Sequence, residues 1–578
     1  MRNILEYLER SAKRCPQKTA VTEREKSMTY AQWQESSKRI GTALCGLRDH
    51  EGKPIPMYRE KGKPIPVYME KGILALQCFF GIVYSGNFYV FLNPELPVTR
   101  LREIVKILEA EVLLTDQEHL EKAKELLTDQ EHFEGAKELL ANQEYLEVAG
   151  KPGCAGVFLA ERLLETPVNE EELNRVREQA VDTDPLYANF TSGSTGVPKG
   201  VLVGHRSVID FIDNFVELFH MRETDVIGNQ APFDFDVSVK DIYSSVSAGA
   251  TLVVIPRELF SQPAALLDMI CEKRITTMIW AVSALCLIST FHGLDYRTPD
   301  CVKKILFSGE VMPKKHLKLW QERLPEAEFV NLYGPTEITC NCTYHRIDRN
   351  RAYEEKIPIG IPFPNEKVFL LDDQDDMVTE PGQVGEICVG GTALAIGYYR
   401  NQEQTEKHFV QNPLNKNCYE RIYRSGDLGC YNERGELYFC GRRDFQIKHM
   451  GHRIELEEIE AMFMKQEGVE RVCCVFDEKK SRLYAAYLGK AREQELLKQV
   501  SDVLPVFMIP RKLVRMETLP ISKNGKIDRG EVLRLVTKKW SRGKESGEGS
   551  KVRSEEGSKV ASDVESEEAS KKGRKETR

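Results

Sequence analysis

The first segment of the chain that could do chemistry is a loop rich in glycine and hydroxyl residues. Residues 190–200 read Phe-Thr-Ser-Gly-Ser-Thr-Gly-Val-Pro-Lys-Gly. Closely spaced backbone N–H groups and hydroxyls can surround phosphate oxygens, and Lys199 adds a positive charge. The loop is not a Walker A motif, because Gly200 follows Lys199 where that motif has Ser or Thr. We favour a phosphate-binding loop, and a flexible turn is the alternative.

Two further segments carry an aromatic ring and carboxylates that could each either contact a ligand or serve only the fold. In residues 331–337, Asn-Leu-Tyr-Gly-Pro-Thr-Glu, the ring of Tyr333 can stack on a base, and the carboxylate of Glu337 is a hard oxygen ligand for magnesium. A core position for Tyr333 and a helix N-terminus for Glu337 are the alternatives. In residues 423–427, Tyr-Arg-Ser-Gly-Asp, Asp427 can accept hydrogen bonds from vicinal hydroxyls or act as a turn residue.

The segments around these residues alternate between strand-like and helix-like patterns. Apolar, β-rich runs at 251–255, 304–307 and 368–371 alternate with amphipathic stretches at 263–273 and 313–324. This alternation is typical of predominantly parallel sheets covered by helices. The predicted fold class is therefore α/β, with doubly wound sheets in a large N-terminal domain.

The sequence changes in character towards the C-terminus. After about residue 360 it becomes Gly-rich with strands and turns, which predicts a β-rich subdomain. A helix-like stretch at 455–467 and a strand-like run at 471–476 predict a small α+β domain. The predicted divisions are residues 1–443, residues 444–540 and a disordered charged tail at 541–578, whose composition cannot bury a core.

Two tandem duplications interrupt the N-terminal domain. Residues 52–61 recur as residues 62–71 with two differences, and residues 113–125 recur as residues 126–138. Solenoids need at least three longer units, so we interpret both as duplicated surface segments. One copy of the first repeat is enough for a strand, and the second repeat predicts extra helical turns.

The composition disfavours several classes of protein. The 578 residues include 81 Lys and Arg against 89 Asp and Glu, a net charge of −8, which argues against nucleic acid as a main partner. No apolar stretch is long enough to span a membrane, and no secretory signal is evident, so we expect a cytoplasmic protein. The 15 cysteines include no Cys-x-x-Cys pair, which disfavours a disulfide scaffold or a structural zinc site.

The motifs resemble, in order, those of the adenylate-forming (AMP-binding) superfamily, which includes amino acid adenylation domains, acyl-coenzyme A synthetases and luciferases. Residues 190–200 are similar to its nucleotide loop, 331–337 to its adenine motif, 423–427 to its ribose motif, 441–451 to its hinge and 520–529 to its C-terminal lysine loop. The resemblance covers about residues 1 to 540. It implies ATP and Mg2+ as cofactors.

The resemblance also implies roles for single residues. Mg2+ would be held by Glu337, and Lys526 would stabilise charge at the α-phosphate, unless it only belongs to an Asn-Gly turn. Glu337 and Thr191 would be further catalytic residues, and Arg442 would contact ribose or phosphate rather than solvent. The implied ATP-binding set is Thr191, Ser192, Gly193, Ser194, Thr195, Gly196, Lys199, Asn331, Tyr333, Gly334, Thr336, Asp427 and Arg442.

The predicted hinge is Asp444. By resemblance, the small domain would pivot there between adenylation and thioester formation, and Gln446, Lys448 and Gly451 would face a thiol-bearing arm in the second state. A salt bridge between Asp444 and a neighbouring arginine is the alternative.

Residues 232–243 contain the Phe-Asp-x-Ser signature of amino-acid-activating members, in which the aspartate, here Asp236, pairs with the substrate α-ammonium. A helix N-cap is the alternative. Within that class the chain resembles D-alanine:carrier-protein ligases, but Ser308 replaces the usual Cys and Lys240 an apolar residue. Lys240 could favour an acidic side chain or extend outward. The implied substrate-binding positions are Asp236, Lys240, Ser308, Leu332 and Cys340.

The prediction is a ligase that forms an aminoacyl adenylate from an amino acid and ATP, then a thioester on the phosphopantetheine of a carrier protein acting in trans. No phosphopantetheine site or condensation motif follows the lysine loop, so we expect a free-standing enzyme. We also expect it to be a monomer. Two alternatives remain: an acyl-coenzyme A synthetase, and a catalytically silent nucleotide-binding protein.

Overall fold

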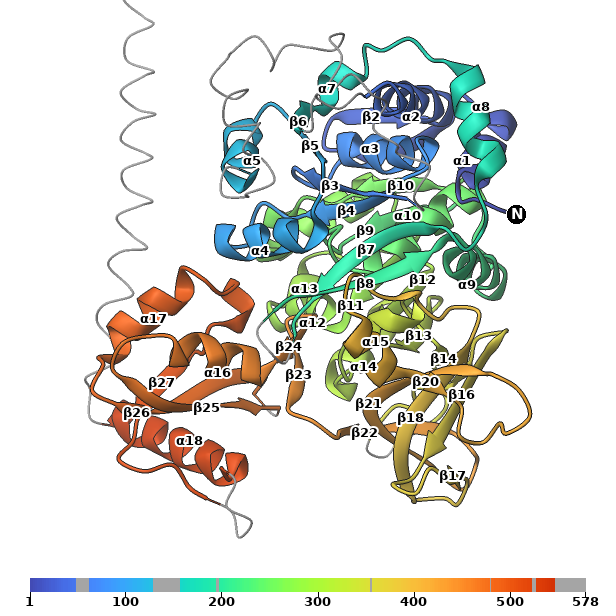
Figure 1. Cartoon of the computed structure of the whole chain (residues 1–578). Helices are drawn as coiled ribbons and strands as arrows, with labels where there is room; N and C mark the ends of the chain where they lie inside the picture. The colour runs from blue at the N-terminus through green and yellow to red at the C-terminus, as the bar shows by residue number, and fades with distance from the viewer. Residues whose placement is uncertain are drawn as a thin grey trace, which may run out of the picture. The chain divides into compact units, whose positions relative to one another are not determined.

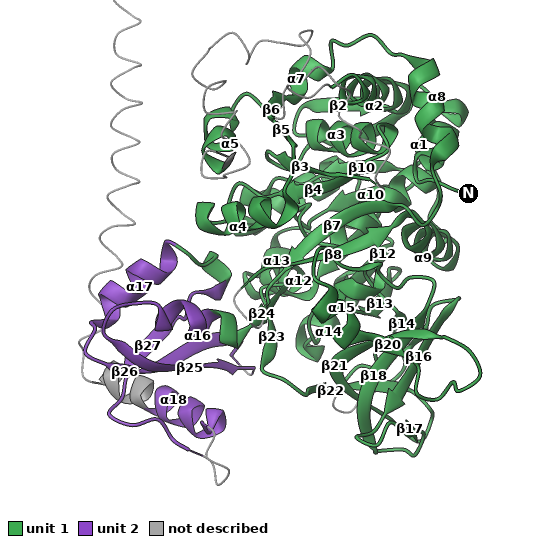
Figure 2. Ribbon diagram, in the orientation of Figure 1, with its two compact units in different colours: residues 1–458, 503–507 green, residues 459–502, 508–578 purple. Residues whose placement is uncertain are grey.

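The structure, a computed structural model, describes residues 1–47, 62–127, 156–193, 197–353, 356–478, 480–521 and 527–545. These residues form two compact units, coloured separately in Figure 2. Unit 1 comprises the described residues of 1–458 and 503–507, and unit 2 those of 459–502 and 508–545. Several predictions lie outside the described residues: repeat copy 52–61, most of copy 126–138, the tail beyond Glu545, and the site residues Ser194, Thr195, Gly196 and Lys526.

Unit 1 contains a nine-stranded sheet. Its strands in spatial order are β15 (Ile361–Pro362), β14 (Thr343–Arg346), β13 (Glu328–Tyr333), β12 (Lys304–Ser308), β11 (Thr277–Ala281), β9 (Val226–Asn229), β10 (Thr251–Val254), β1 (Thr19–Glu23) and β2 (Lys26–Thr29). The six strands from β13 to β1 are parallel, and the outer strands are antiparallel. Their carboxyl ends therefore share one edge, where open α/β sheets bind ligands.

A seven-stranded sheet forms the other large layer of unit 1. Its strands in spatial order are β19 (Gly397–Tyr398), β8 (Lys199–Gly204), β7 (Pro185–Thr191), β4 (Phe88–Leu92), β3 (Pro64–Tyr68), β5 (Val112–Thr115) and β6 (Gly156–Leu159). Every residue of β3 and β4 is buried, as expected for parallel strands covered on both faces. The second copy of the ten-residue repeat supplies β3.

Helices surround these two sheets (Figure 1). They are α1 (Leu5–Arg14), α2 (Tyr30–Cys45), α3 (Ile73–Tyr84), α4 (Val98–Leu108), α5 (Leu120–Leu127), α7 (Ala160–Leu163), α8 (Glu170–Gln179), α9 (His205–Leu218), α10 (Val237–Ala248), α11 (Pro263–Glu272), α12 (Val282–Thr290), α13 (Gly293–Tyr296), α14 (Lys314–Arg323) and α15 (Gln402–His408). Local chemistry explains their starts. Thr29 and Gln32 form a reciprocal capping box at α2, and Pro263 opens α11.

A third, antiparallel sheet completes the β-rich part of unit 1. Its strands are β17 (Met377–Val378), β16 (Glu366–Leu371), β18 (Val384–Gly391), β21 (Arg421–Tyr431) and β20 (Phe409–Gln411), and β22 (Leu437–Arg442) pairs with β21. A separate hairpin of β23 (Gln446–His449) and β24 (His452–Glu455) follows. The predicted domain boundary at Asp444 lies just before this hairpin and stays a prediction.

Unit 2 is a small α+β unit. Antiparallel β25 (Val469–Asp477) and β26 (Arg482–Gly489) are extended by parallel β27 (Lys512–Arg515). α16 (Leu456–Met464) runs into this unit, which also contains α17 (Glu493–Ser501) and α18 (Arg529–Glu545). Cys473, Val475 and Tyr484 of the sheet pack with Val532 and Val536 of α18.

The predicted fold class is confirmed: unit 1 has two large mixed sheets with helices and a β-rich sheet, and unit 2 is α+β. Within the described ranges, no helix is both long and apolar enough to span a membrane. The described cysteines form no disulfide.

Candidate active site

Polar side chains meet at the carboxyl edge of the nine-stranded sheet. Ser308 ends β12, and Tyr333 ends the neighbouring parallel strand β13. Asp236 immediately precedes α10, which follows β9 in the chain. Since these strands run in the same direction, their ends bring residues far apart in sequence together. This edge is the candidate site.

Five buried residues form what we call the α10 cluster: Asp236, Lys240, Ser308, Cys340 and Asn341. Lys240 Nζ donates to Asn341 Oδ1 at 2.7 Å and to Ser308 Oγ at 3.4 Å. Cys340 Sγ donates to the backbone carbonyl of Asp236 at 3.1 Å. Four of the five were singled out from the sequence as substrate-binding positions. The contacts bring these four together.

Burial disfavours the charged forms of two side chains of the α10 cluster, Asp236 and Lys240. Asp236 occupies the N-cap position of α10, but its side chain makes no capping hydrogen bond, so capping does not explain the carboxylate. Burial raises the pKa of Asp236, while Lys240 and a hydrogen bond with Thr336 oppose that rise. Lys240 does not extend outward, since it is fully buried, and burial lowers its pKa.

Gly334 allows the loop after β13 to fold back towards α10. A Cβ at Gly334 would lie 2.5 Å from Asn341 Cα and 2.8 Å from Cys342 N, closer than packed atoms tolerate. The short 3-10 helix η4 (Thr336–Ile338) lies inside this loop. Gly334 therefore permits the turn that places Cys340 and Asn341 beside Lys240.

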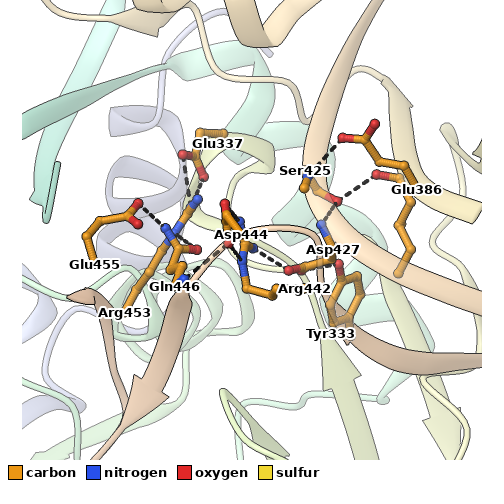
Figure 3. Close-up of polar contacts among 12 residues, drawn as sticks. Tyr333, Glu337, Glu386, Ser425, Asp427, Arg442, Asp444, Gln446, Arg453 and Glu455 are labelled. Atoms are coloured by element: carbon orange, nitrogen blue, oxygen red, sulfur yellow. Dashed lines mark hydrogen bonds and ion pairs between the residues drawn. The ribbon is translucent and has the colours of Figure 1, made fainter. Parts of the chain in front are cut away.

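A second group, which we call the β21 cluster, comprises Tyr333, Asp427, Arg442 and Asp444 (Figure 3). Arg442 donates to Asp427, its partner across the β21–β22 pair. Tyr333 Oη donates to the second oxygen of Asp427 at 2.5 Å. Arg442 Nε and Nη2 donate to the two oxygens of Asp444 at 2.6 and 2.7 Å. Burial and the Asp427 charge raise the pKa of Tyr333, so its hydroxyl stays protonated as a donor.

The contacts of the β21 cluster bear on the alternative roles that the sequence left open for Asp427, Arg442 and Asp444. Asp427 lies within strand β21 rather than in a simple turn. The side chain of Arg442 is only 10% exposed, so it is not a solvated arginine. Asp444 makes the ion pair that competes with the hinge interpretation, and the hinge itself stays a prediction.

Glu337 is buried and already paired within the chain. Arg453 Nη1, from β24, lies 2.7 and 3.0 Å from the two Glu337 oxygens, and Tyr398 Oη donates to one of them at 2.7 Å. Burial alone would raise the pKa of Glu337, but Arg453 and Tyr398 outweigh it and lower the pKa to about 2. Gln446 links Arg453 to Glu455 (Figure 3). Glu337 is therefore ionised at neutral pH.

The donor set around Glu337 fits a magnesium ion that arrives with phosphates. Among the described residues, no group of three or more His, Cys, Asp or Glu could hold a metal ion. Mg2+ in nucleotide sites commonly takes one or two carboxylates and completes its shell with phosphate and water oxygens. An ionised, buried Glu337 meets that need. Arg453 would first have to release it.

The hairpin of β23 and β24 contacts both sides of the site. Lys448 Nζ lies 5.7 Å from the Tyr333 ring centroid, and burial lowers the pKa of Lys448. The N–H of Gly451 donates to Glu310 Oε1 at 3.0 Å. Of the three residues predicted to face a thiol-bearing arm, Lys448 and Gly451 thus contact other segments of unit 1, and Gln446 contacts residues of its own hairpin.

The described ends of the glycine-rich loop lie beside the partners of Glu337. Thr191 ends β7 and pairs with Lys199 at the start of β8. Ser192 Oγ donates to the backbone carbonyl of Arg453 at 2.6 Å. Lys199 Nζ lies 5.8 Å from the ring centroid of Tyr398, and burial lowers the pKa of Lys199. A cation is therefore available next to Glu337.

Three predicted residues make contacts that stabilise the fold. Asn331 Nδ2 donates to the backbone carbonyl of Pro358 at 2.9 Å, and Leu332 belongs to the main hydrophobic core. A Cβ at Gly193 would lie 2.1 Å from the carbonyl oxygen of Val197, so no larger side chain fits there.

Comparison with family models gives a match over most of the chain. The AMP-binding enzyme model matches residues 8–399, and the AMP-binding enzyme C-terminal domain model matches residues 458–526. The chain belongs to the AMP-binding enzyme family. The predicted resemblance to the adenylate-forming superfamily is thereby confirmed.

Individual relatives of this AMP-binding enzyme include a synthase subunit and a carrier protein ligase. The enzyme is 30% identical to surfactin synthase subunit 1 of Bacillus subtilis (strain 168) over 91% of this chain but only 14% of that protein. It is 29% identical to the D-alanine--D-alanyl carrier protein ligase of Bacillus cytotoxicus over 92% of this chain and 99% of that protein. Its structure matches that of holo-PA1221, an NRPS protein with adenylation and PCP domains, with a TM-score of 0.71, 25% identity and 92% and 84% of the two chains covered.

The sequence did not single out three residues of the site: Arg453, Tyr398 and Asn341. Asn341 adjoins the predicted Cys340, so proximity in sequence was an available signal. Arg453 alternates with Glu455 in a short strand-like run, a pattern of paired charges that could have marked it. Nothing in the sequence around Tyr398 pointed to Glu337.

Proposed function

We propose that this AMP-binding enzyme activates an α-amino acid with ATP and then transfers the aminoacyl group to the phosphopantetheine thiol of a carrier protein. One observation carries the proposal, the buried carboxylate of Asp236. That carboxylate caps no helix. Within the described chain, Thr336 donates a hydrogen bond to it and Lys240 acts on its charge, but no Lys, Arg or His lies within ion-pair distance of it. A buried carboxylate in this state is suited to a substrate ammonium.

In the first step, an oxygen of the amino acid α-carboxylate forms a bond to the α-phosphorus of ATP, and the bond from that phosphorus to the bridging oxygen breaks. Pyrophosphate leaves with the electron pair. Two anions must approach each other, so the demand on the protein is positioning and charge neutralisation. Lys199 is a described cation near the predicted phosphate loop, and Lys526 is the predicted cation at the α-phosphate.

The nucleotide would lie along the β21 cluster. Asp427 would accept hydrogen bonds from the ribose hydroxyls, and the ring of Tyr333 would stack on adenine. Both Asp427 oxygens are engaged by Arg442 and Tyr333, so a ribose would share or replace these donors. Glu337 would hold magnesium, which when bound neutralises phosphate charge.

In the second step, the thiol sulfur attacks the acyl carbon, the bond from that carbon to the AMP oxygen breaks, and the thiol proton is released. The carboxylate oxygens of Glu337 that contact Arg453 cannot bind a metal ion at the same time. The Glu337–Arg453 pair and metal binding would therefore belong to different steps. We propose that the hairpin leaves Glu337 for adenylation and returns afterwards. The names of the carrier ligase and of the protein with adenylation and PCP domains support a carrier as the acceptor.

ATP–pyrophosphate exchange with a panel of amino acids and fatty acids tests the proposal. Exchange stimulated by an amino acid, followed by loading of a purified phosphopantetheinylated carrier protein, is the expected result. Exchange with fatty acids alone would indicate an acyl-coenzyme A synthetase. ATP binding without exchange for any acid would indicate a silent nucleotide-binding protein.

A further inference from the structure

We propose that Lys240 selects an amino acid whose side chain carries a second carboxylate. The inference rests on the proposed function, because it needs an amino acid held at Asp236. It adds the substrate class, which the sequence left between D-alanine and an acidic side chain.

The buried ammonium of Lys240 contacts only neutral oxygens of the described chain. Its side chain is fully buried, and the two partners of its ammonium, Asn341 Oδ1 and Ser308 Oγ, are neutral oxygens. Across the described ranges, no carboxylate lies within 4.0 Å of Lys240 Nζ, and Asp236 and Asp241 act on its charge from farther away. An ammonium has three donors, and a buried charge without a contacting counter-ion is costly. Lys240 therefore has capacity for an anionic partner.

One oxygen of the adjacent Asp241 side chain, Oδ2, is engaged elsewhere, and Oδ1 has no hydrogen-bond partner among the described residues. Asp241 Oδ2 accepts from Asn229 Nδ2 at 2.8 Å, and Lys71 Nζ binds the side-chain oxygen of the same Asn229 at 3.0 Å. Burial raises the pKa of Asp241 to about 8, which disfavours its ionised form. Asp241 is thus a poor counter-ion for Lys240.

A carboxylate and an ammonium, those of Asp236 and Lys240, follow one another along α10. Asp236 and Lys240 are four residues apart, so they lie on one helix face about one turn apart. The Sγ of Cys340 contacts the backbone of Asp236, and both charged side chains act electrostatically on that thiol. An amino acid with an acidic side chain offers an ammonium to Asp236 and a carboxylate to Lys240, leaving its α-carboxylate to react.

A purely structural role for Lys240 makes a different prediction. If Lys240 only held Asn341 in place, loss of its charge would weaken all substrates together. If Lys240 pairs with a substrate carboxylate, loss of its charge would weaken acidic substrates alone and would appear in KM more than in kcat.

The experiment measures ATP–pyrophosphate exchange by the full chain with L- and D-forms of glutamate, aspartate, glutamine, asparagine and alanine, and with fatty acids. We expect an acidic amino acid to exceed its amide by at least about tenfold in kcat/KM. In Lys240→Met, this acid-to-amide ratio should fall by about 100-fold, with most of the loss in KM. Lys71→Met, which changes a partly buried lysine outside the α10 cluster, should leave the ratio unchanged.

The remaining outcomes separate this inference from the proposed function. If a neutral amino acid is the best substrate and Lys240→Met leaves the ratio unchanged, the inference is overturned and the proposed function stands. If no amino acid supports exchange, both fail. Should Lys240→Met not fold, Lys240→Gln and the wild-type ranking of acid against amide decide the question.

Discussion

The α10 cluster and the β21 cluster are both buried, yet they balance their charges differently. In the β21 cluster, Asp427 and Asp444 share one arginine of the chain, Arg442. Glu337 is likewise paired with Arg453. In the α10 cluster, the carboxylate of Asp236 accepts a hydrogen bond from Thr336, and the ammonium of Lys240 donates to neutral oxygens. The first arrangement is complete without a ligand, and the second is not.

Under the proposed function, this difference would let one site serve two kinds of ligand. Ion pairs with arginines of the protein lower the pKa of Glu337 and of Asp444, and in the proposed function a ligand has to replace one of these partners. The α10 cluster instead keeps two opposite charges apart, so a ligand with complementary charges gains from both. Substitutions in the two regions should therefore fail in different ways.

The largest expected effect comes from Asp236→Ala. We expect kcat/KM for amino-acid-dependent exchange to fall about 1,000-fold, because a substrate ammonium would lose its buried counter-ion. Exchange kinetics with the best substrate measure this. Asp234→Asn is the matched control, since Asp234 lies in the same segment and contacts Asn93 instead, and it should cost less than about tenfold. Retention of exchange by Asp236→Ala within tenfold of wild type would contradict the assignment.

Glu337→Gln should lower exchange by about 100-fold, because the proposed magnesium ligand loses its charge. It should also change acid stability. The pKa of Glu337 is lowered from 4.5 to about 2, so its contribution of roughly 3 kcal/mol is complete above pH 4.5 and is lost as the pH falls towards 2. Unfolding free energies of Glu337→Gln should thus decline less steeply than wild type between pH 5 and 2. Parallel profiles would contradict the Glu337–Arg453 account.

Arg453→Met should show whether Arg453 and a magnesium ion compete for the carboxylate of Glu337. Removing the arginine leaves a buried carboxylate unpaired, so the ligand-free Tm should fall by about 3 °C. Mg2+ with ATP should then raise Tm more than in wild type, because Glu337 is free to accept the ion. Arg206→Met, which breaks an exposed pair with Asp182, should shift Tm by less than about 1 °C. An equal ligand-induced shift in wild type and Arg453→Met would argue against competition for Glu337.

Tyr333→Phe should give the smallest effect. It removes the hydrogen bond to Asp427 but keeps the ring and the Arg442 partner, so KM for ATP should rise about threefold to tenfold. Tyr333→Ala should raise KM further because it also removes the stacking surface. Equal KM values for the two variants would show that the ring makes no contact with the nucleotide.

The sequence predicted the fold class and most of the residues in the two clusters, because strand and helix periodicity and ordered motifs are local signals. It did not predict the pairing of Glu337 with Arg453, which joins residues 116 positions apart through the fold. It also left the direction of Lys240 open, since only the turn permitted by Gly334 places Asn341 within reach of the ammonium. Partners of buried charges depend on tertiary packing, which no local pattern encodes.

The most direct test of the account identifies the adenylate itself. The enzyme is incubated with ATP, Mg2+ and an equimolar mixture of L- and D-amino acids and fatty acids, and the bound product is identified by mass spectrometry after rapid quenching. The account predicts an aminoacyl adenylate with a second carboxylate in its side chain, which disappears in Asp236→Ala. A fatty acyl adenylate, or an aminoacyl adenylate that forms equally well in Asp236→Ala, would contradict it.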